Sequence, residues 1–135
     1  RAQIVDEVIR PALAAGSVVL CDRYGDSTLA YQGYGHAQPL AALRALNAYA
    51  TGGLLPDLTL YIDIDVATGI RRKPAGGLDR LEANALAFHE AVRAGYHTLA
   101  QEEPVRWLLL DGTQSIEALH SQILVRVTHA LASHA

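Results

Sequence analysis

An aspartate and an arginine stand side by side directly after a short apolar run. Residues 18–21 read Val-Val-Leu-Cys, and Asp22 and Arg23 follow them. Because ligands of open α/β sheets bind at the carboxyl ends of the strands, we expect this pair to face a ligand. A guanidinium holds a phosphate through two parallel hydrogen bonds, and a neighbouring carboxylate can hold Mg²⁺ directly or through water. The alternative is that Asp22 caps a turn and Arg23 pairs with another acid.

Side chains that suit a small polar ligand follow this pair along the chain. They are Ser27, Thr28, Tyr31 and Gln32, and glycines stand among them. The two hydroxyls, the phenol and the amide supply hydrogen-bond donors and acceptors for such a ligand. The alternative is an ordinary turn in which Tyr31 is a half-buried aromatic residue.

A basic segment is the second candidate. Arg71, Arg72 and Lys73 precede residues 74–77, which read Pro-Ala-Gly-Gly. The segment resembles the mobile lid of the nucleoside monophosphate kinases, in which cations on a closing flap can neutralise the charge of a transferring phosphoryl group and exclude water. The alternative is a solvated basic loop beyond a helix C-terminus, where cations are favoured in any case.

Other polar residues favour structural roles. Asp63 and Asp65 are placed to end a strand and to start a helix. The histidines show no metal-ligand spacing paired with carboxylates or cysteines, so we expect no metal site built on histidine.

The sequence pattern predicts alternating helices and strands that would position these residues. The apolar run at residues 18–21 lacks alternation, which is typical of a strand covered on both faces, and Cys21 is therefore expected to be buried and inert. Further strands are predicted at residues 58–64 and 105–110. Pro11 is expected to kink or end the first helix. The expected helices cover residues 1 to about 15, 39 to about 51, about 66 to the basic segment, 79 to about 101, and about 115 to 131. This order predicts a doubly wound α/β domain over residues 1–135.

Composition narrows the class of protein. The chain has 135 residues, of which 50% are hydrophobic, and a formal net charge of −3, so we expect neither disorder nor bulk nucleic-acid binding. The single cysteine excludes a disulfide framework within the chain and fits a reducing cytoplasm. We find no apolar segment long enough to cross a membrane and no signal peptide. The first residue is Arg1 rather than Met, and the start has the character of a cut helix.

Residues 22–33, Asp-Arg-Tyr-Gly-Asp-Ser-Thr-Leu-Ala-Tyr-Gln-Gly, resemble the DRY-x-DST-x-AYQG signature of the thymidylate kinases. The segments VIRPAL, TGG-LLPDLTLYIDID, LDRLE and DGTQSIE follow the family's order from Arg1 to about residue 123. The resemblance implies a P-loop NTPase-type fold, a three-layer α/β/α parallel sheet. It also implies phosphorylation of dTMP to dTDP by ATP with Mg²⁺, and a homodimer.

The resemblance also implies roles for single residues. Arg23 would clamp the acceptor phosphate, Asp22 would help to hold Mg²⁺ through water, and Arg71, Arg72 or Lys73 would act from a lid. The substrate-binding residues would be Arg1, Ser27, Thr28, Tyr31 and Gln32, with Thr28 near the thymine edge and Tyr31 against the sugar. His36 departs from the family's G-x-G-R pattern, and residues 74–77 depart where bacterial members carry further lid arginines.

The family's phosphate loop, G-x-x-x-x-G-K-[ST], does not occur in these 135 residues. Neither does the family's first strand, which is central in its 2-3-1-4-5 sheet. We therefore expect an N-terminally truncated domain that is unstable, rearranged or completed by another polypeptide, and that lacks kinase activity by itself. The alternatives are a non-catalytic nucleotide-binding or dimerising remnant, and a related kinase acting on another deoxynucleoside or monophosphate.

Overall fold

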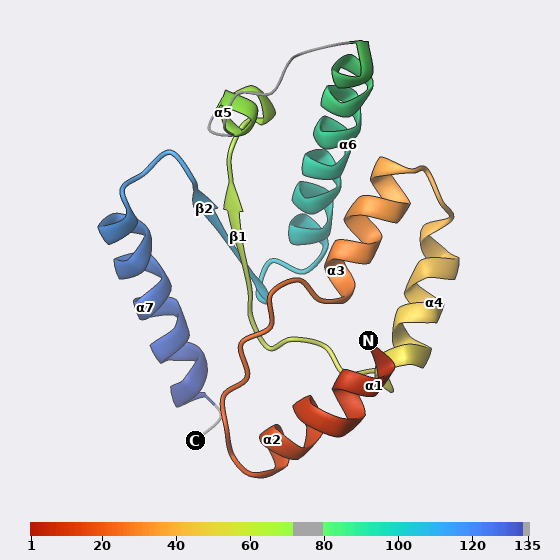
Figure 1. Ribbon diagram of the computed structural model, residues 1–135. Coiled ribbons are helices and arrows are strands. Elements are labelled where there is room, and N and C mark those ends of the chain that lie inside the picture. Colours follow the sequence, from red (N-terminus) through yellow and green to blue (C-terminus); the bar gives the residue numbers. More distant parts are fainter. Residues whose placement is uncertain (72–79, 134–135) are drawn as a thin grey trace. The chain divides into compact units, whose positions relative to one another are not determined.

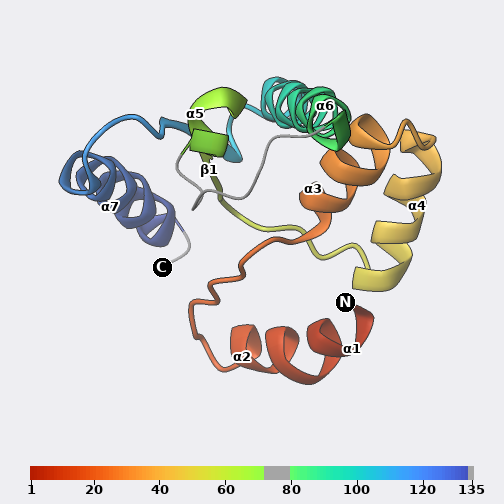
Figure 2. The ribbon, with the colours of Figure 1, turned by 45° about the horizontal axis from the view of Figure 1, so that its top comes forward.

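The computed structural model describes residues 1–71 and 80–133. The chain divides into two compact units, Arg1–Leu55 and Pro56–Ala135 (Figures 1 and 2), and each is described here by itself. The single domain expected over residues 1–135 stays a prediction. Among the described residues no helix is long and apolar enough to cross a membrane.

The first unit begins with one continuous helical run. It consists of α1 (Ala2–Ile4), the wider π-type turn η1 (Val5–Ile9) and α2 (Arg10–Ala14). Pro11 has no N–H to donate, and the irregular turn directly before it is where the expected break in regular hydrogen bonding occurs. The helix nevertheless continues past Pro11 and ends before Gly16, whose positive φ of 77° suits glycine.

Residues 18–21 form no strand, which corrects the sequence prediction. In the described part of the chain they pair with no other strand, and Val18 and Leu20 are 62% and 90% exposed. Their apolar pattern suits a buried strand, but a strand also needs a neighbour for its backbone groups. Cys21 is exposed rather than buried for the same reason, and its thiol lies 3.7 Å from the carbonyl oxygen of Arg23.

The polar segment after Arg23 is more helical than the sequence indicates. The polar, glycine-containing pattern of residues 22–38 predicts a loop with one helical turn, whereas the structure forms α3 (Gly25–Thr28) and the π-type η2 (Leu29–Gly35) there. A Cβ at Gly33 would stand 2.3 Å from Cδ2 of Leu40, so glycine allows η2 to approach α4 (Leu40–Thr51). As predicted, α4 starts after Pro39 and ends at Gly52, which is left-handed. The buried hydrophobic side chains of this unit are Val5, Ile9, Leu29 and Ala30.

The second unit is built on a two-stranded parallel sheet. Strand β1 (Thr59–Asp63) pairs with β2 (Trp107–Asp111), and Asp63 stands opposite Asp111 in the register. Helices α6 (Arg80–Glu102) and α7 (Ile116–Ala132) flank the sheet on opposite sides in both views (Figures 1 and 2). The structure therefore confirms two of the three predicted strands and an α/β architecture with a parallel sheet.

Side-chain hydrogen bonds lie where the sequence predicts that two helices of this unit begin. Asp65 accepts a hydrogen bond from the Thr68 N–H at 2.8 Å and starts α5 (Val66–Arg71). Ser115 accepts one from the Ala118 N–H at 3.2 Å and starts α7. The aromatic residues Tyr61 and Tyr96 stack with their ring centroids 4.6 Å apart, which joins β1 to α6. The buried hydrophobic side chains here are Val92, Leu99, Ala100, Trp107 and Leu110.

Candidate functional site

The Arg1 guanidinium reaches from the start of the first helix to two other helices. Its Nη2 donates to Oγ1 of Thr28 at 2.8 Å and to the carbonyl oxygen of Tyr24 at 3.2 Å. Its Nη1 donates to Oδ1 of Asn47, also at 2.8 Å. The guanidinium carbon lies 5.7 Å from the Tyr24 ring centroid. Two residues predicted to bind substrate, Arg1 and Thr28, are thus brought into direct contact.

The helices around this contact are joined by Asn47. Its Nδ2 donates to the carbonyl oxygen of Gly25 at 3.0 Å, so one side chain of α4 bonds both Arg1 and the first residue of α3. Gly25 is buried, and a Cβ there would lie 3.4 Å from Nδ2 of Asn47. The phenol of Tyr24 adds a bond to the carbonyl oxygen of Leu54 at 3.2 Å. The bonds of Asn47 and Tyr24 therefore hold the groups around the Arg1 guanidinium in place.

Arg23 lies against another predicted site residue. Its guanidinium carbon is 5.1 Å from the ring centroid of Tyr31. Arg23 has a positive φ of 59°, which is uncommon for a residue with a side chain and costs on the order of 1–3 kcal/mol. Such strain is concentrated at functional sites. Asp22 and Arg23 are both exposed, so their charged groups are accessible to a ligand.

Ser27 and Gln32 complete the predicted substrate group. Ser27 is half-buried in α3, and Gln32 is exposed on η2. Asp26 directly precedes Ser27 and was assigned no role from the sequence. It is only 9% exposed. Asp26, Ser27 and Gln32 thus lie on consecutive turns of the helical run that α3 and η2 form together.

The predicted lid residues belong to the second unit. Arg71 ends α5, is exposed, and donates from Nη2 to Oγ1 of Thr68 at 2.5 Å. Arg72 and Lys73 lie outside the described residues, as do residues 74–77. The lid therefore stays a prediction.

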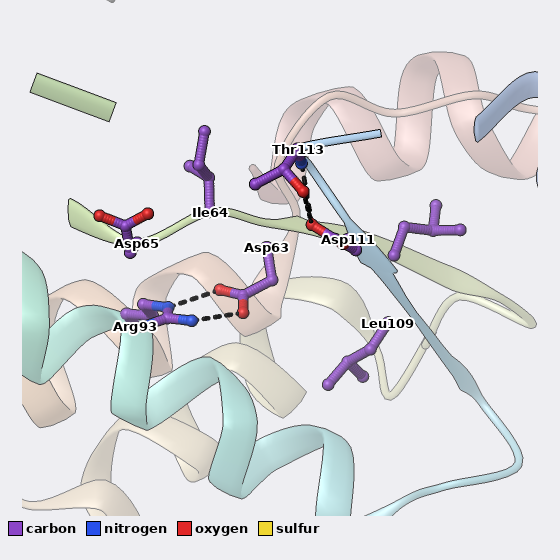
Figure 3. Close-up of a pocket in the computed structure, with 8 residues that line it drawn as sticks. Asp63, Ile64, Asp65, Arg93, Leu109, Asp111 and Thr113 are labelled. Atoms are coloured by element: carbon purple, nitrogen blue, oxygen red, sulfur yellow. Dashed lines mark hydrogen bonds and ion pairs between the residues drawn. The ribbon is translucent and has the colours of Figure 1, made fainter. Parts of the chain in front are cut away.

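Charged residues also gather at the carboxyl ends of β1 and β2 (Figure 3). Asp63 accepts two hydrogen bonds of 2.7 Å from Nε and Nη2 of Arg93, and Nε2 of His97 lies 3.1 Å from its Oδ2. The bonded Arg93 guanidinium lowers the pKa of the Asp63 carboxyl. Burial and the neighbouring Asp63 carboxylate raise the pKa of the Tyr61 phenol. The partners of Asp63 on α6 thus hold that helix to the end of β1.

The same edge of the sheet contains a hollow of about 300 Å³. Asp63, Asp65, Arg93, Asp111 and Thr113 contribute to its lining (Figure 3). Oδ1 of Asp111 accepts hydrogen bonds from the N–H and the hydroxyl of Thr113, at 2.9 and 2.7 Å, which lower the pKa of that carboxyl. Bonds from Thr68 likewise lower the pKa of the Asp65 carboxyl.

Each carboxylate of this hollow thus has a structural partner. The structural roles expected for Asp63 and Asp65 are confirmed: Asp63 ends β1 and Asp65 starts α5. Among the described residues no group of three or more histidine, cysteine, aspartate or glutamate side chains is arranged to hold a metal ion.

The sequence analysis missed Asn47 and Arg93. Asn47 had a detectable signal: it stands in the apolar helix that begins after Pro39, four residues after Leu43 and on the same stripe. A polar residue on such a stripe needs a hydrogen-bond partner, and Arg1 and Gly25 are its partners here. Arg93 had no such signal, because a basic residue on a long helix is usually solvated.

These features define an α/β protein whose first unit gathers arginine, hydroxyl and aromatic side chains around one helical run. The sequence profile of the thymidylate kinase family matches residues 1–123. A thymidylate kinase of Roseiflexus sp. (strain RS-1) is 51% identical to this chain, over 98% of this chain and 65% of its own length. A thymidylate kinase of Roseiflexus castenholzii is 52% identical, over 98% of this chain and 64% of its own length. A thymidylate kinase of Deinococcus radiodurans is 50% identical over 95% of this chain and 63% of its own length.

The chain belongs to the thymidylate kinase family. It spans about 65% of the length of the Roseiflexus sp. relative.

Proposed function

We propose that the protein is a thymidylate kinase, which transfers the γ-phosphoryl group of ATP to dTMP and forms dTDP. Family membership supports the reaction class. The observation that carries the substrate assignment is the bond of Arg1 to Thr28 within the motif of residues 22–33. It joins a cationic donor and a hydroxyl at one point, which suits the carbonyl and N–H edge of a pyrimidine base.

The acceptor phosphate is assigned to Arg23. Its guanidinium is exposed, permanently charged and able to donate two parallel hydrogen bonds to phosphate oxygens. The ring of Tyr31 beneath the guanidinium restricts its orientation, which lowers the entropy lost when the phosphate binds. Tyr31 also contributes the wall against the deoxyribose, and Ser27 and Gln32 supply further polar contacts.

Asp22 fits a Mg²⁺ ion held through water. It is a single exposed carboxylate next to the phosphate-binding Arg23, and Mg²⁺ is commonly bound by one or two carboxylates together with waters and substrate phosphates. The bound ion would neutralise negative charge on the phosphate groups. Asp22 contributes by accepting hydrogen bonds from water in that coordination shell.

The phosphates of ATP require groups that this chain does not carry, since no G-x-x-x-x-G-K-[ST] loop occurs in its 135 residues. We therefore propose that the chain by itself does not transfer a phosphoryl group. The lid role of Arg71, Arg72 and Lys73, the homodimer and the cytoplasmic location form part of the same proposal. Their support is the family resemblance and, for the location, the single cysteine.

The test is formation of dTDP from dTMP, ATP and Mg²⁺, measured by chromatography of the nucleotides. The natural protein isolated from its source cells is compared with the 135-residue chain. We expect dTDP from the natural protein and none from the chain. Turnover by the chain would overturn its proposed inactivity. Binding of dTMP by the natural protein without turnover would instead favour the non-catalytic remnant.

A further inference from the structure

We propose that Asn47 is a positioning residue for nucleotide recognition, which acts by orienting the Arg1 guanidinium toward the base. This inference rests on the proposed function, since it names the residue that prepares the same site for dTMP. Asn47 has this role without contacting the nucleotide itself.

The geometry of Arg1 carries the first step. A guanidinium is planar, so two bonds made by different nitrogens fix its plane. Nη1 of Arg1 is held by Oδ1 of Asn47, and Nη2 is held by Oγ1 of Thr28, both at 2.8 Å. The Nη2 bond to the Tyr24 carbonyl oxygen at 3.2 Å closes the arrangement. With the Asn47 bond removed, the guanidinium turns about its remaining contacts.

The second step concerns the orientation of the Asn47 amide. Its Nδ2 donates to the carbonyl oxygen of Gly25 at 3.0 Å, which leaves Oδ1 as the atom that faces Arg1. A flipped amide would place N–H donors against the donors of Arg1 and two carbonyl oxygens against each other. One side chain therefore has the donor and the acceptor that its two partners require, and neither leucine nor alanine supplies them.

A purely structural role is the competing explanation. Asn47 also joins α4 to α3 through Gly25, so its loss lowers stability whether or not Arg1 matters. The two explanations differ in one respect. A positioning effect disappears when Arg1 is already absent, whereas a structural effect is the same with and without Arg1.

The experiment is a double-mutant cycle in the natural protein with the substitutions Arg1→Ala and Asn47→Ala. The dissociation constant of dTMP is measured by calorimetry, and the melting temperature of each variant is recorded. We expect N47A to weaken dTMP binding roughly tenfold when Arg1 is present and by less than about twofold when Arg1 is absent. Equal weakening in both backgrounds would overturn the proposal.

Two further variants separate recognition from stability. Thr51→Ala removes a hydroxyl that donates to the backbone oxygen of Asn47 at 2.9 Å, so it weakens the same helix without touching Arg1. It should lower the melting temperature and leave dTMP affinity unchanged. Asn47→Asp keeps an acceptor for Arg1 but loses the donor to Gly25, so it should retain most of the affinity while losing stability. Loss of affinity in T51A, or in N47D to the level of N47A, would contradict the positioning role.

The outcomes also distinguish this proposal from the proposed function. If the unsubstituted natural protein binds no dTMP, the proposed function is wrong and the role of Asn47 is overturned with it. If dTMP binds and the cycle is additive, the function stands and only the positioning role is overturned.

Discussion

The guanidinium of Arg1 donates a 2.8 Å hydrogen bond to the hydroxyl of Thr28, a residue 27 positions further along the chain. This bond connects the first helix of the chain to the helical run that follows Arg23. A charged donor and a hydroxyl that lie together can both hydrogen-bond to the edge of a base, whereas either group alone is a common surface feature. The bond is the observation on which the proposed dTMP site rests.

Replacing Thr28 by valine should weaken dTMP binding by about tenfold, because it removes a hydroxyl bonded to a charged group while keeping the side chain's shape. Calorimetry with dTMP measures the change. Thr98→Val is the matched control, since the Thr98 hydroxyl donates to the Ala94 carbonyl oxygen within α6, in the second unit. Equal losses of affinity in both variants would count against a specific role for Thr28.

Replacing Arg23 by lysine should weaken dTMP binding by about tenfold or more, because an ammonium cannot form the paired hydrogen bonds of a guanidinium. Deoxythymidine serves as the control ligand, since it lacks the phosphate. Its affinity should be nearly unchanged in R23K. If both ligands lose affinity alike, Arg23 does not contact the phosphate.

Replacing Gly112 by alanine should lower the free energy of unfolding by about 1–3 kcal/mol, as overpacking does elsewhere. The added Cβ would lie 2.8 Å from the carbonyl oxygen of Asp63, which also accepts the Gly112 N–H at 2.6 Å. Gly69→Ala is the control, because among the described residues its Cβ would meet only Cγ2 of Ile64, at 3.7 Å, and Gly69 lies inside helix α5. Urea unfolding should show G69A to be neutral or stabilised. A neutral G112A would contradict the close approach of β2 to Asp63.

Stability should depend on pH through Asp63. Its pKa is lowered in the folded protein by Arg93, so its contribution to the free energy of unfolding is present above the unfolded carboxyl pKa of about 3.9. That contribution is lost as the pH falls through the folded pKa. The difference between the unsubstituted protein and D63N should therefore be larger at about pH 7 than at about pH 3.

Asp6→Asn provides the control for this titration. The Asp6 side chain is 74% exposed and lies 3.8 Å from Nε of Arg10, a surface pair of small energetic effect. D6N should change stability little at either pH. A D63N difference that grows on acidification would have the wrong sign for a carboxyl of lowered pKa.

Local signals in the sequence were sufficient for much of the fold. Asp65 and Ser115 marked helix starts, Gly52 marked a helix end, and the runs around Thr59–Asp63 and Trp107–Asp111 marked strands. These signals act through bonds to residues nearby in the chain, which a single sequence displays.

Partners distant in the sequence were harder to predict. The run at residues 18–21 has the composition of a strand, but whether it forms one depends on a neighbour that its own residues do not reveal. Cys21 was misplaced as buried for that reason. At the candidate site, the motif of residues 22–33 indicated Thr28 and Arg23. The position of Asn47 on an apolar stripe indicated that it needs a partner, but only the structure identifies that partner as Arg1.

The most direct test of the account is calorimetric titration of the natural protein with dTMP, dUMP, dCMP and deoxythymidine. If Arg1 and Thr28 bind the edge of the base and Arg23 binds the phosphate, dTMP should bind more tightly than dCMP, whose base edge differs, and than deoxythymidine, which lacks the phosphate. dUMP has the same base edge and phosphate as dTMP and is the control ligand for these contacts. Equal affinity for dTMP and dCMP, or no measurable binding of dTMP, would contradict the assignment of this site to thymidylate.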